Sequence, residues 1–353
     1  MNGTMIIYML GWVMNLEAAF MLLPCLTALI YRESAGFSFL IVAFALLIAG
    51  VLCTFRKPAN KAFYAREGFA VVALSWILLS VTGALPFVIS GEIPHFIDAM
   101  FETVSGFTTT GSSILTDVEA LSRCMLFWRS FTHWIGGMGV LVFMLAIVPM
   151  AGGQSIHLLR AESPGPAVSK LVPRLRGTAT ILYGIYLVMT VAEILLLLAT
   201  GMPVFDSITI AFGTAGTGGG IKVSRIVVAV KAVAKELARF IHPRNVRMLK
   251  LEGKKVEHET LRTINIFLTA YFLLFALSTL LISLDNFDLI TSFTSVAATL
   301  NNIGPGLEIV GPMSNFSAFS GLSKCVLMFD MLAGRLELFP MLLLFVPATW
   351  KRN

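Results

Sequence analysis

Apolar residues in this chain are gathered into long runs separated by short polar segments. A bilayer core about 30 Å thick needs roughly 20 apolar residues per helix, and seven runs approach or exceed that length. They are residues 5–30, 37–54, 68–89, 125–150, 178–200, 263–284 and 322–349. The pattern therefore predicts an all-α polytopic membrane protein with about seven spans, of which the first is too long to be a signal peptide.

Composition excludes the main alternatives. Of the 353 residues, 57% are hydrophobic and 13% are charged, whereas soluble domains carry about 25% charged residues. A soluble globular protein, a secreted disulfide scaffold and a disordered chain are therefore ruled out. The histidines and cysteines lack HxxxH and CxxC spacings, so a metal enzyme gains little support.

Basic residues predict the orientation of the chain in the membrane. They gather in residues 55–68, 151–177, 221–262 and 351–352, and loops rich in Lys and Arg face the cytoplasm. This assignment conflicts with the count of spans. Run 178–200 leaves the cytoplasm, residues 221–262 must be back inside, and only residues 201–221 lie between them. One helix, or an odd number of helices, is therefore expected to be missing near residue 220.

Three segments share a pattern that predicts short re-entrant helices. In each, an aromatic residue and an Asp open a short semi-polar stretch, and a glycine-containing polar turn follows. Gly111 follows Asp98, Gly218 follows Asp206 and Gly304 follows Asp288, at comparable spacings along the chain. Asp is a good N-cap for such helices and favours their positive dipole end.

Such segments are too short to span, and irregular backbone at membrane depth is tolerated only where it lines a cavity or is buried in protein. Half-helix ends with partial negative charge, together with backbone carbonyls, replace the hydration shell of a monovalent cation. The alternative is three ordinary outer loops with turn residues. Internal repetition favours the cation filter.

Charged residues within apolar runs are further candidates, because they usually face a cavity or one another. The last run contains Asp330, Arg335 and Glu337. They are interpreted either as a structural Arg–carboxylate pair or as an Arg beside the permeation path. Glu17, in the first run, is expected to form a packing pair or to lie at the interface. Lys231, Lys235 and Arg239 predict a basic stripe on a cytoplasmic helix, solvated or docked to a partner or anionic lipid, and nucleic acid binding is not indicated.

Several motifs resemble the Trk/Ktr potassium transporter superfamily, specifically its TrkH type. They are EGFAVVALSWILLSVTGALPF (68–87), FETVSGFTTTGSS (101–113), HWIGGMGVLVFMLAIVPM (133–150), GGGIKVSR (218–225), FIHPRNV (240–246), LNNIGPGLE (300–308) and AGRLELFP (333–340). The resemblance extends over nearly the whole chain. It implies helix–pore-loop–helix repeats around one pore, preceded by two extra N-terminal helices.

The resemblance also implies the function and its residues. It predicts potassium uptake across the bacterial inner membrane, no tightly bound cofactor, and no enzymatic activity. Arg335 would supply a gating charge below the filter. The filter residues would be Thr108, Thr109, Thr110, Gly111, Ser112, Ala215, Gly216, Thr217, Gly218, Asn301, Asn302, Ile303 and Gly304. Besides lipid, the implied partners are a second copy of the chain and a cytoplasmic nucleotide-binding regulatory subunit of the TrkA type. Whether Na⁺ or H⁺ couples to transport (symport) stays open.

Set against the family pattern, the repeats of this chain are incomplete. The predicted units are two N-terminal helices (1–66), a first repeat (67–150), a linker (151–177), half of a second repeat (178–217), the end of a third repeat with a basic segment (218–262), and a fourth repeat (263–353). The closing helix of the second repeat and most of the third repeat are expected to be missing. Residues 214–220 are therefore interpreted as a remnant of either a filter or the gate loop beneath it.

Two other functions are compatible with parts of the pattern. The first is a non-conducting, internally deleted relative, because an incomplete barrel would expose unsatisfied backbone to lipid. The second is a small-anion transporter or a membrane enzyme. Anion sites favour helix N-termini and cations aimed at the cavity, whereas here Asp is expected at all three N-caps and no catalytic constellation is present.

Overall fold

The computed structural model describes residues 1–58, 64–139, 175–214, 218–241, 250–251, 254–255 and 258–350. Most of the described residues are helical, as predicted. The only strands among them are the two-residue pair β1 (Lys250–Leu251) and β2 (Lys254–Lys255), which are antiparallel. The long helices are α1 (Gly3–Phe20), α3 (Gly36–Phe55), α4 (Ala65–Ser90), α6 (Arg123–Met138), α9 (Leu175–Ala199), α11 (Val223–Ile241), α12 (His258–Ile282) and α14 (Gly321–Arg335). The shorter ones are α2 (Leu22–Tyr31), α5 (Phe96–Phe107), α10 (Val204–Thr214), α13 (Leu289–Leu300), α15 (Phe339–Leu344), α16 (Pro347–Trp350), and the 3₁₀ turns η3 (Ser283–Asp285) and η4 (Glu308–Val310).

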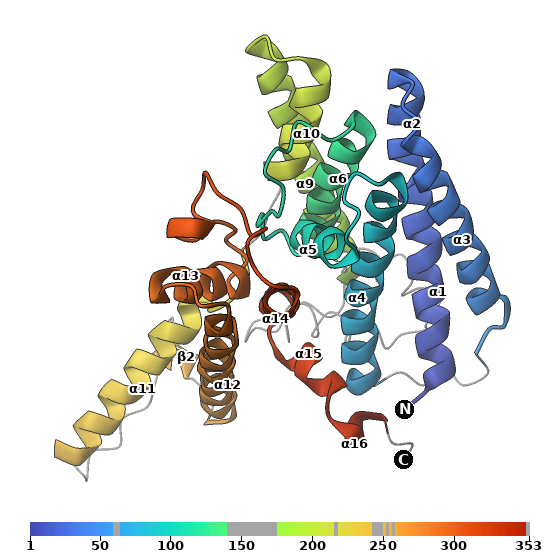
Figure 1. Ribbon diagram of the computed structural model, residues 1–353. Helices are drawn as coiled ribbons and strands as arrows, with labels where there is room; N and C mark the ends of the chain where they lie inside the picture. Colours follow the sequence, from blue (N-terminus) through green and yellow to red (C-terminus); the bar gives the residue numbers. More distant parts are fainter. Residues whose placement is uncertain are drawn as a thin grey trace.

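Helices α1, α3 and α4 run side by side along one edge, and α11 and α12 form the opposite edge (Figure 1). The short helix α5 lies between these edges, whereas α13 lies above α11 and α12 in this view (Figure 1). The start of α1, the end of α3 and α16 lie at the same end of the molecule (Figure 1). Because basic residues cluster after α3 and along α11, this end is called the inner end below.

Four helices among the described residues are long and apolar enough to cross a membrane: Gly3–Tyr31, Gly36–Phe55, Arg66–Ser90 and Glu259–Asp285. The first combines α1 and α2, which meet at Met21, shortly before Pro24. A proline in a helix removes one backbone hydrogen bond and bends the axis. The second half of the predicted run 125–150 lies outside the described residues.

The predicted span 322–349 is wrong as a single helix. It is divided into α14, α15 and α16, and Glu337 and Leu338 adopt left-handed φ values of 59° and 65° between the first two. Pro340 stands in the first turn of α15 and Pro347 opens α16, positions where proline is tolerated and where the preceding helix has ended. Apolar content alone predicted one helix, and the prolines were the signal against it.

The three predicted short helices are all present, as α5, α10 and α13. Helices α4, α5 and α6 follow the order long, short, long, and α12, α13 and α14 repeat that order. Helices α9 and α10 match only the first two parts. The unit boundaries therefore stay predictions, and most of the linker 151–177 falls outside the described residues.

The course of the chain after α10 explains the conflict in the charge topology. Near the start of α10, the Phe205 ring lies 5.5 Å from the ring of Tyr31 at the end of α2. After α10, the Gly220 amide donates to the Gly334 carbonyl near the inner end of α14. The described residues on either side of 215–217 thus lead inward to α11 (Figure 1). The described residues 218–222, which precede α11, are neither helix nor strand.

Candidate functional site

The C-terminal ends of α5 and α13 have the same backbone hydrogen bonds. Thr109 N donates to the Gly106 carbonyl and Thr110 N to the Ser105 carbonyl, both at 2.9 Å. Asn302 N and Ile303 N repeat these sequence offsets at 3.1 and 2.8 Å. This pair of bonds is a Schellman motif, which terminates a helix with one left-handed residue.

The same register continues into the loops that follow. Thr109 and Asn302 have φ values of 56° and 52°, and beyond them Gly111 and Gly304 have φ values of 83° and 102°. Glycine is favoured at such positions because it has no Cβ. Two segments far apart in the sequence therefore adopt one backbone conformation, which supports their interpretation as repeats.

These two loops lie against each other. The Ser112 hydroxyl donates to the Gly304 carbonyl at 2.9 Å, and the Asn302 side-chain amide donates to the Thr110 hydroxyl at 2.9 Å. A Cβ added at Gly304 would lie 2.6 Å from the Thr110 carbonyl oxygen and 3.5 Å from Gly111 Cα. The predicted filter residues from the first and last repeats are thus brought to one place.

Helices α6 and α14 follow the short helices α5 and α13, and each places a glycine against the last carbonyl of the short helix before it. A Cβ built on Gly136 of α6 would lie 1.9 Å from the Phe107 carbonyl, and one on Gly334 of α14 would lie 2.1 Å from the Leu300 carbonyl. Phe107 and Leu300 are the final residues of α5 and α13. The negative ends of both helix dipoles are therefore held next to the paired loops.

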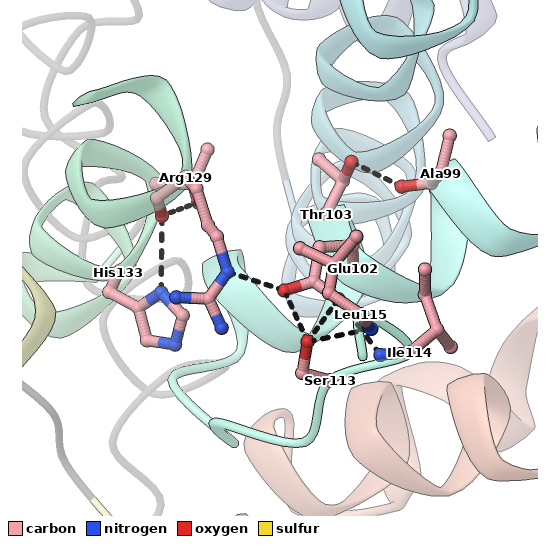
Figure 2. Close-up of polar contacts among 9 residues, drawn as sticks. Ala99, Glu102, Thr103, Ser113, Ile114, Leu115, Arg129 and His133 are labelled. Atoms are coloured by element: carbon pink, nitrogen blue, oxygen red, sulfur yellow. Dashed lines mark hydrogen bonds and ion pairs between the residues drawn. The ribbon is translucent and has the colours of Figure 1, made fainter. Parts of the chain in front are cut away.

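An ion pair between Glu102 and Arg129 holds the end of the loop that follows α5. Glu102 of α5 accepts from Arg129 Nε of α6 at 2.5 Å, from the Ser113 hydroxyl at 2.9 and 3.1 Å, and from Ile114 N at 3.1 Å. Figure 2 shows these contacts, together with His133 Nδ1, which lies 3.2 Å from the Arg129 carbonyl. Glu102 is 2% exposed.

A pocket of about 230 Å³ lies on the inner side of the paired loops. It is lined by Trp76, residues 137–139, residues 218–220, Lys222 and residues 334–337. The Arg335 guanidinium donates to the Gly136 carbonyl and lies 5.6 Å from the centre of the Trp76 ring. Glu337 accepts from both Lys222 and Arg225, so it links α11 to the break after α14.

The glycine-rich segment contributes to this pocket. Gly219 N donates to the Asn301 carbonyl at 3.1 Å. A Cβ on Gly219 would lie 2.0 Å from Asn302 Oδ1, and one on Gly220 would lie 2.0 Å from Asn301 Oδ1. Of the predicted second filter strand, Ala215, Gly216 and Thr217 lie outside the described residues. Gly218 shares the pocket with Arg335.

The expected N-caps are correct at one position only. Asp288 caps α13 and accepts from Thr291 N at 3.1 Å. Asp98 lies within the first turn of α5 and pairs with Lys324 at 2.6 Å, and Asp206 lies within the first turn of α10. Asp98 is thus oriented by a cation on α14, which the local sequence does not reveal.

Other charged residues pair across helices without touching the loops. Glu17 accepts from the Thr82 hydroxyl at 2.6 Å, which fits the predicted packing pair. Asp330 accepts from the Ser278 hydroxyl at 2.8 Å. Throughout the part of the chain that the structure describes, no group of His, Cys, Asp and Glu residues is arranged to bind a metal ion.

Sequence reasoning did not single out Glu102 and Arg129. The available signal was their charge: Glu102 lies in a predicted re-entrant helix and Arg129 in the run 125–150, and charged groups at membrane depth are costly unless paired. Their separation along the chain, from one helix to the next, gave no sign that they would meet.

Comparisons with known proteins agree with this architecture. The family model TrkH, described as a cation transport protein, matches residues 35–208 and 198–352 in two segments. The Trk system potassium uptake protein TrkH of Salmonella typhimurium is 31% identical, over 97% of this chain and 98% of the relative. The Trk system potassium uptake protein TrkG of Escherichia coli K12 is 26% identical, over 98% of each.

A solved structure is also similar. The crystal structure of the potassium transporter TrkH from Vibrio parahaemolyticus has a TM-score of 0.84 and 26% sequence identity, covering 99% of this chain and 100% of that one. The Salmonella alignment runs over 475 positions, whereas this chain has 353 residues. At least 122 positions (475 − 353) therefore have no counterpart in this chain.

Proposed function

Because this chain belongs to the TrkH family of cation transport proteins, we propose that it takes up potassium through the paired loops after α5 and α13. Carbonyl oxygens of residues 108–112 and 301–304 replace water around the ion. The observation that carries the proposal is the repeated backbone conformation of these loops and their direct contact through Ser112 and Gly304. Family membership makes the chain a transporter and excludes the enzyme and anion alternatives.

The electrostatics of the loops fit a monovalent cation. The C-terminal ends of α5 and α13 meet the loops and carry partial negative charge. Helix dipoles and carbonyls offer many weak oxygen ligands, which suit an ion that must enter and leave. Carboxylate Asp98 is neutralised by Lys324, so the attraction comes chiefly from the backbone.

Below the filter we propose a gate formed by Arg335 and residues 218–220. The shared pocket and the glycine contacts with Asn301 and Asn302 support the gate-loop interpretation of this segment over its interpretation as a filter strand. A cation in the permeation path opposes potassium by charge repulsion, so movement of Arg335 would change conduction.

The test of the proposed function is rubidium uptake in a host that lacks its own potassium uptake systems. We expect uptake by the parent chain and its loss in Gly304→Ala, because the new Cβ would meet the Thr110 carbonyl at a left-handed position. The matched control is Gly184→Ala in α9, where a Cβ meets nothing within 4 Å. Equal uptake by both variants would contradict the filter assignment.

The second candidate function is that of a non-conducting, shortened family member. The alignment gap of at least 122 positions (475 − 353) favours it, as does a family match that divides into two segments near residues 198–208. Sequencing the source locus distinguishes a natural short reading frame from a longer one. Failure of uptake at normal membrane levels, with potassium binding retained, would support this candidate.

We also propose the partners that a Trk system implies: a second copy of the chain in the bacterial inner membrane and a cytoplasmic nucleotide-binding subunit. The support is the family membership and the basic helix α11, which diverges from α12 toward the inner end (Figure 1). Light scattering of the detergent-solubilised chain tests the dimer. A monomeric mass would contradict it.

A further inference from the structure

Glu102 has an unusual place for a carboxylate. It lies on α5 at membrane depth with 2% of its surface exposed, and burying a charge is costly unless it is paired and hydrogen-bonded. Its two oxygens accept from three groups: Arg129 Nε, the Ser113 hydroxyl and Ile114 N. Two of these groups belong to the segment directly after the filter residues 108–112. Residues 110–114 are called the first filter strand below, although they pair in no β-sheet.

The first filter strand is therefore held at both ends by one helix. At its start, Thr110 N bonds to the Ser105 carbonyl of α5. At its end, Ser113 and Ile114 bond to Glu102 of the same helix. The distance between these two anchors is set by α5 itself, so the strand between them cannot lengthen or shorten freely.

Arg129 fixes the position of the Glu102 carboxylate. It reaches from α6 and is 19% exposed at its side chain. The Ser113 carbonyl in turn accepts from Phe316 N at 2.8 Å, so the same strand end is tied to the loop before α14. Figure 2 shows Glu102 as the centre from which α5, α6 and the strand are joined.

The last repeat ties the equivalent amide to its own short helix through a residue one position earlier than the counterpart of Glu102, which is Ser295. Leu307 follows its filter glycine at the same spacing as Ile114, and Leu307 N donates to the Thr294 hydroxyl of α13 at 3.0 Å. A Cβ on Gly306 would lie 3.0 Å from that hydroxyl. Both described filter strands are thus tied to their own short helix, the first through a charged pair and the last through a neutral hydroxyl.

We propose that the Glu102–Arg129 pair is a positioning device that holds the first filter strand at the spacing suited to potassium and so sets the preference for potassium over sodium. This inference rests on the proposed function. Neither residue contacts the ion. Binding sites must be held within about 0.5 Å of their working geometry by supporting residues, and Glu102 is the anchor of this strand on its outer side.

The experiment compares Glu102→Gln and Arg129→Lys with Thr103→Val. Thr103 is the neighbour of Glu102 on α5, is equally buried, and donates only to the Ala99 carbonyl of its own helix (Figure 2). Two quantities are measured. The first is the ratio of the sodium and potassium concentrations that halve rubidium uptake. The second is the difference in melting temperature of the purified protein between KCl and NaCl. The second needs binding alone, so it applies even if the chain does not conduct.

We expect Glu102→Gln to reduce the preference for potassium about tenfold, equivalent to about 1.4 kcal/mol, and to reduce the potassium-specific rise in melting temperature. Arg129→Lys keeps the charge and should lose less, while Thr103→Val should match the parent. If Glu102→Gln keeps the parent's selectivity in both measurements, this inference is wrong although the proposed function stands. If the parent shows neither uptake nor a potassium-specific rise, both are overturned.

Discussion

Substituting Gly334 by alanine tests how closely helix α14 supports the proposed filter. A helical Gly→Ala change ordinarily stabilises by about 1 kcal/mol, because alanine has the higher helix propensity. At Gly334 the added Cβ would lie 2.1 Å from the Leu300 carbonyl oxygen, and real Cβ contacts essentially never fall below 3.0 Å. The atoms must therefore separate by at least 0.9 Å (3.0 − 2.1).

Neither side of this contact yields easily. Leu300 ends α13, and the Schellman hydrogen bonds fix Asn302 and Ile303 just beyond it. The Asn302 side chain also donates to the Met331 carbonyl of α14. Overpacking of this kind costs about 1–3 kcal/mol. After subtraction of the gain in helix propensity, a net loss of up to about 2 kcal/mol in the free energy of unfolding is expected. Rubidium uptake should also be lost, because the proposed filter segment after α13 would move.

The assay is the melting temperature of the detergent-solubilised protein alongside rubidium uptake. Gly184→Ala is the matched control, because its Cβ meets nothing within 4 Å, and it should be as stable as the parent or more so. If Gly334→Ala has the same melting temperature as Gly184→Ala and transports rubidium normally, the close packing of α14 against α13 does not position the proposed filter.

Three further predictions concern the connections between elements. Arg225→Ala should destabilise more than Lys222→Ala by thermal melting, because both pair with Glu337 but their side chains are 12% and 50% exposed, and exposed pairs contribute little; equal losses would contradict this. Glu33→Gln should lower stability by about 1 kcal/mol, since Glu33 accepts from the first two amides of α6 at 2.9 Å, and an unchanged melting temperature would refute the capping role. Hydrogen bonds from Thr291 hold the pKa of Asp288 below its usual value, so its contribution is present above the unfolded pKa of about 3.9 and is lost as the pH falls further. On acidification below about pH 4, the melting temperature of Asp288→Asn should therefore fall less than that of the parent. If the melting temperatures of the two proteins fall in parallel with pH, Asp288 does not stabilise the fold in this way.

Most helices could be predicted because their signals are local. Apolar runs of sufficient length predicted α3, α4, α9 and α12, and the aromatic–Asp–glycine pattern predicted α5, α10 and α13. The pattern failed at residues 322–349, where Glu337 is buried against α11 and Pro340 begins a new helix. Apolar content does not distinguish a straight helix from one that is broken to place a charge.

The candidate site was predictable only in part. The positions of Gly111 and Gly304 follow from turn chemistry, which depends on nearest neighbours. That Gly304 would lie against Thr110, that Arg129 would meet Glu102, and that Gly219 would lie against Asn302 depended on packing between segments far apart in sequence. No local spacing contains that information.

The sequence by itself determined a multi-pass helical membrane protein and its short helices, because hydrophobic length and glycine placement act over a few turns of chain. The orientation, drawn from loop charge, and the interruption near residue 220 stay predictions. Tertiary structure alone decided which residues meet at the proposed filter, how its first segment is anchored, and that residues 218–220 share a pocket with Arg335. Those outcomes depend on long-range contacts, in which a carbonyl and a glycine from different helices must come within van der Waals distance.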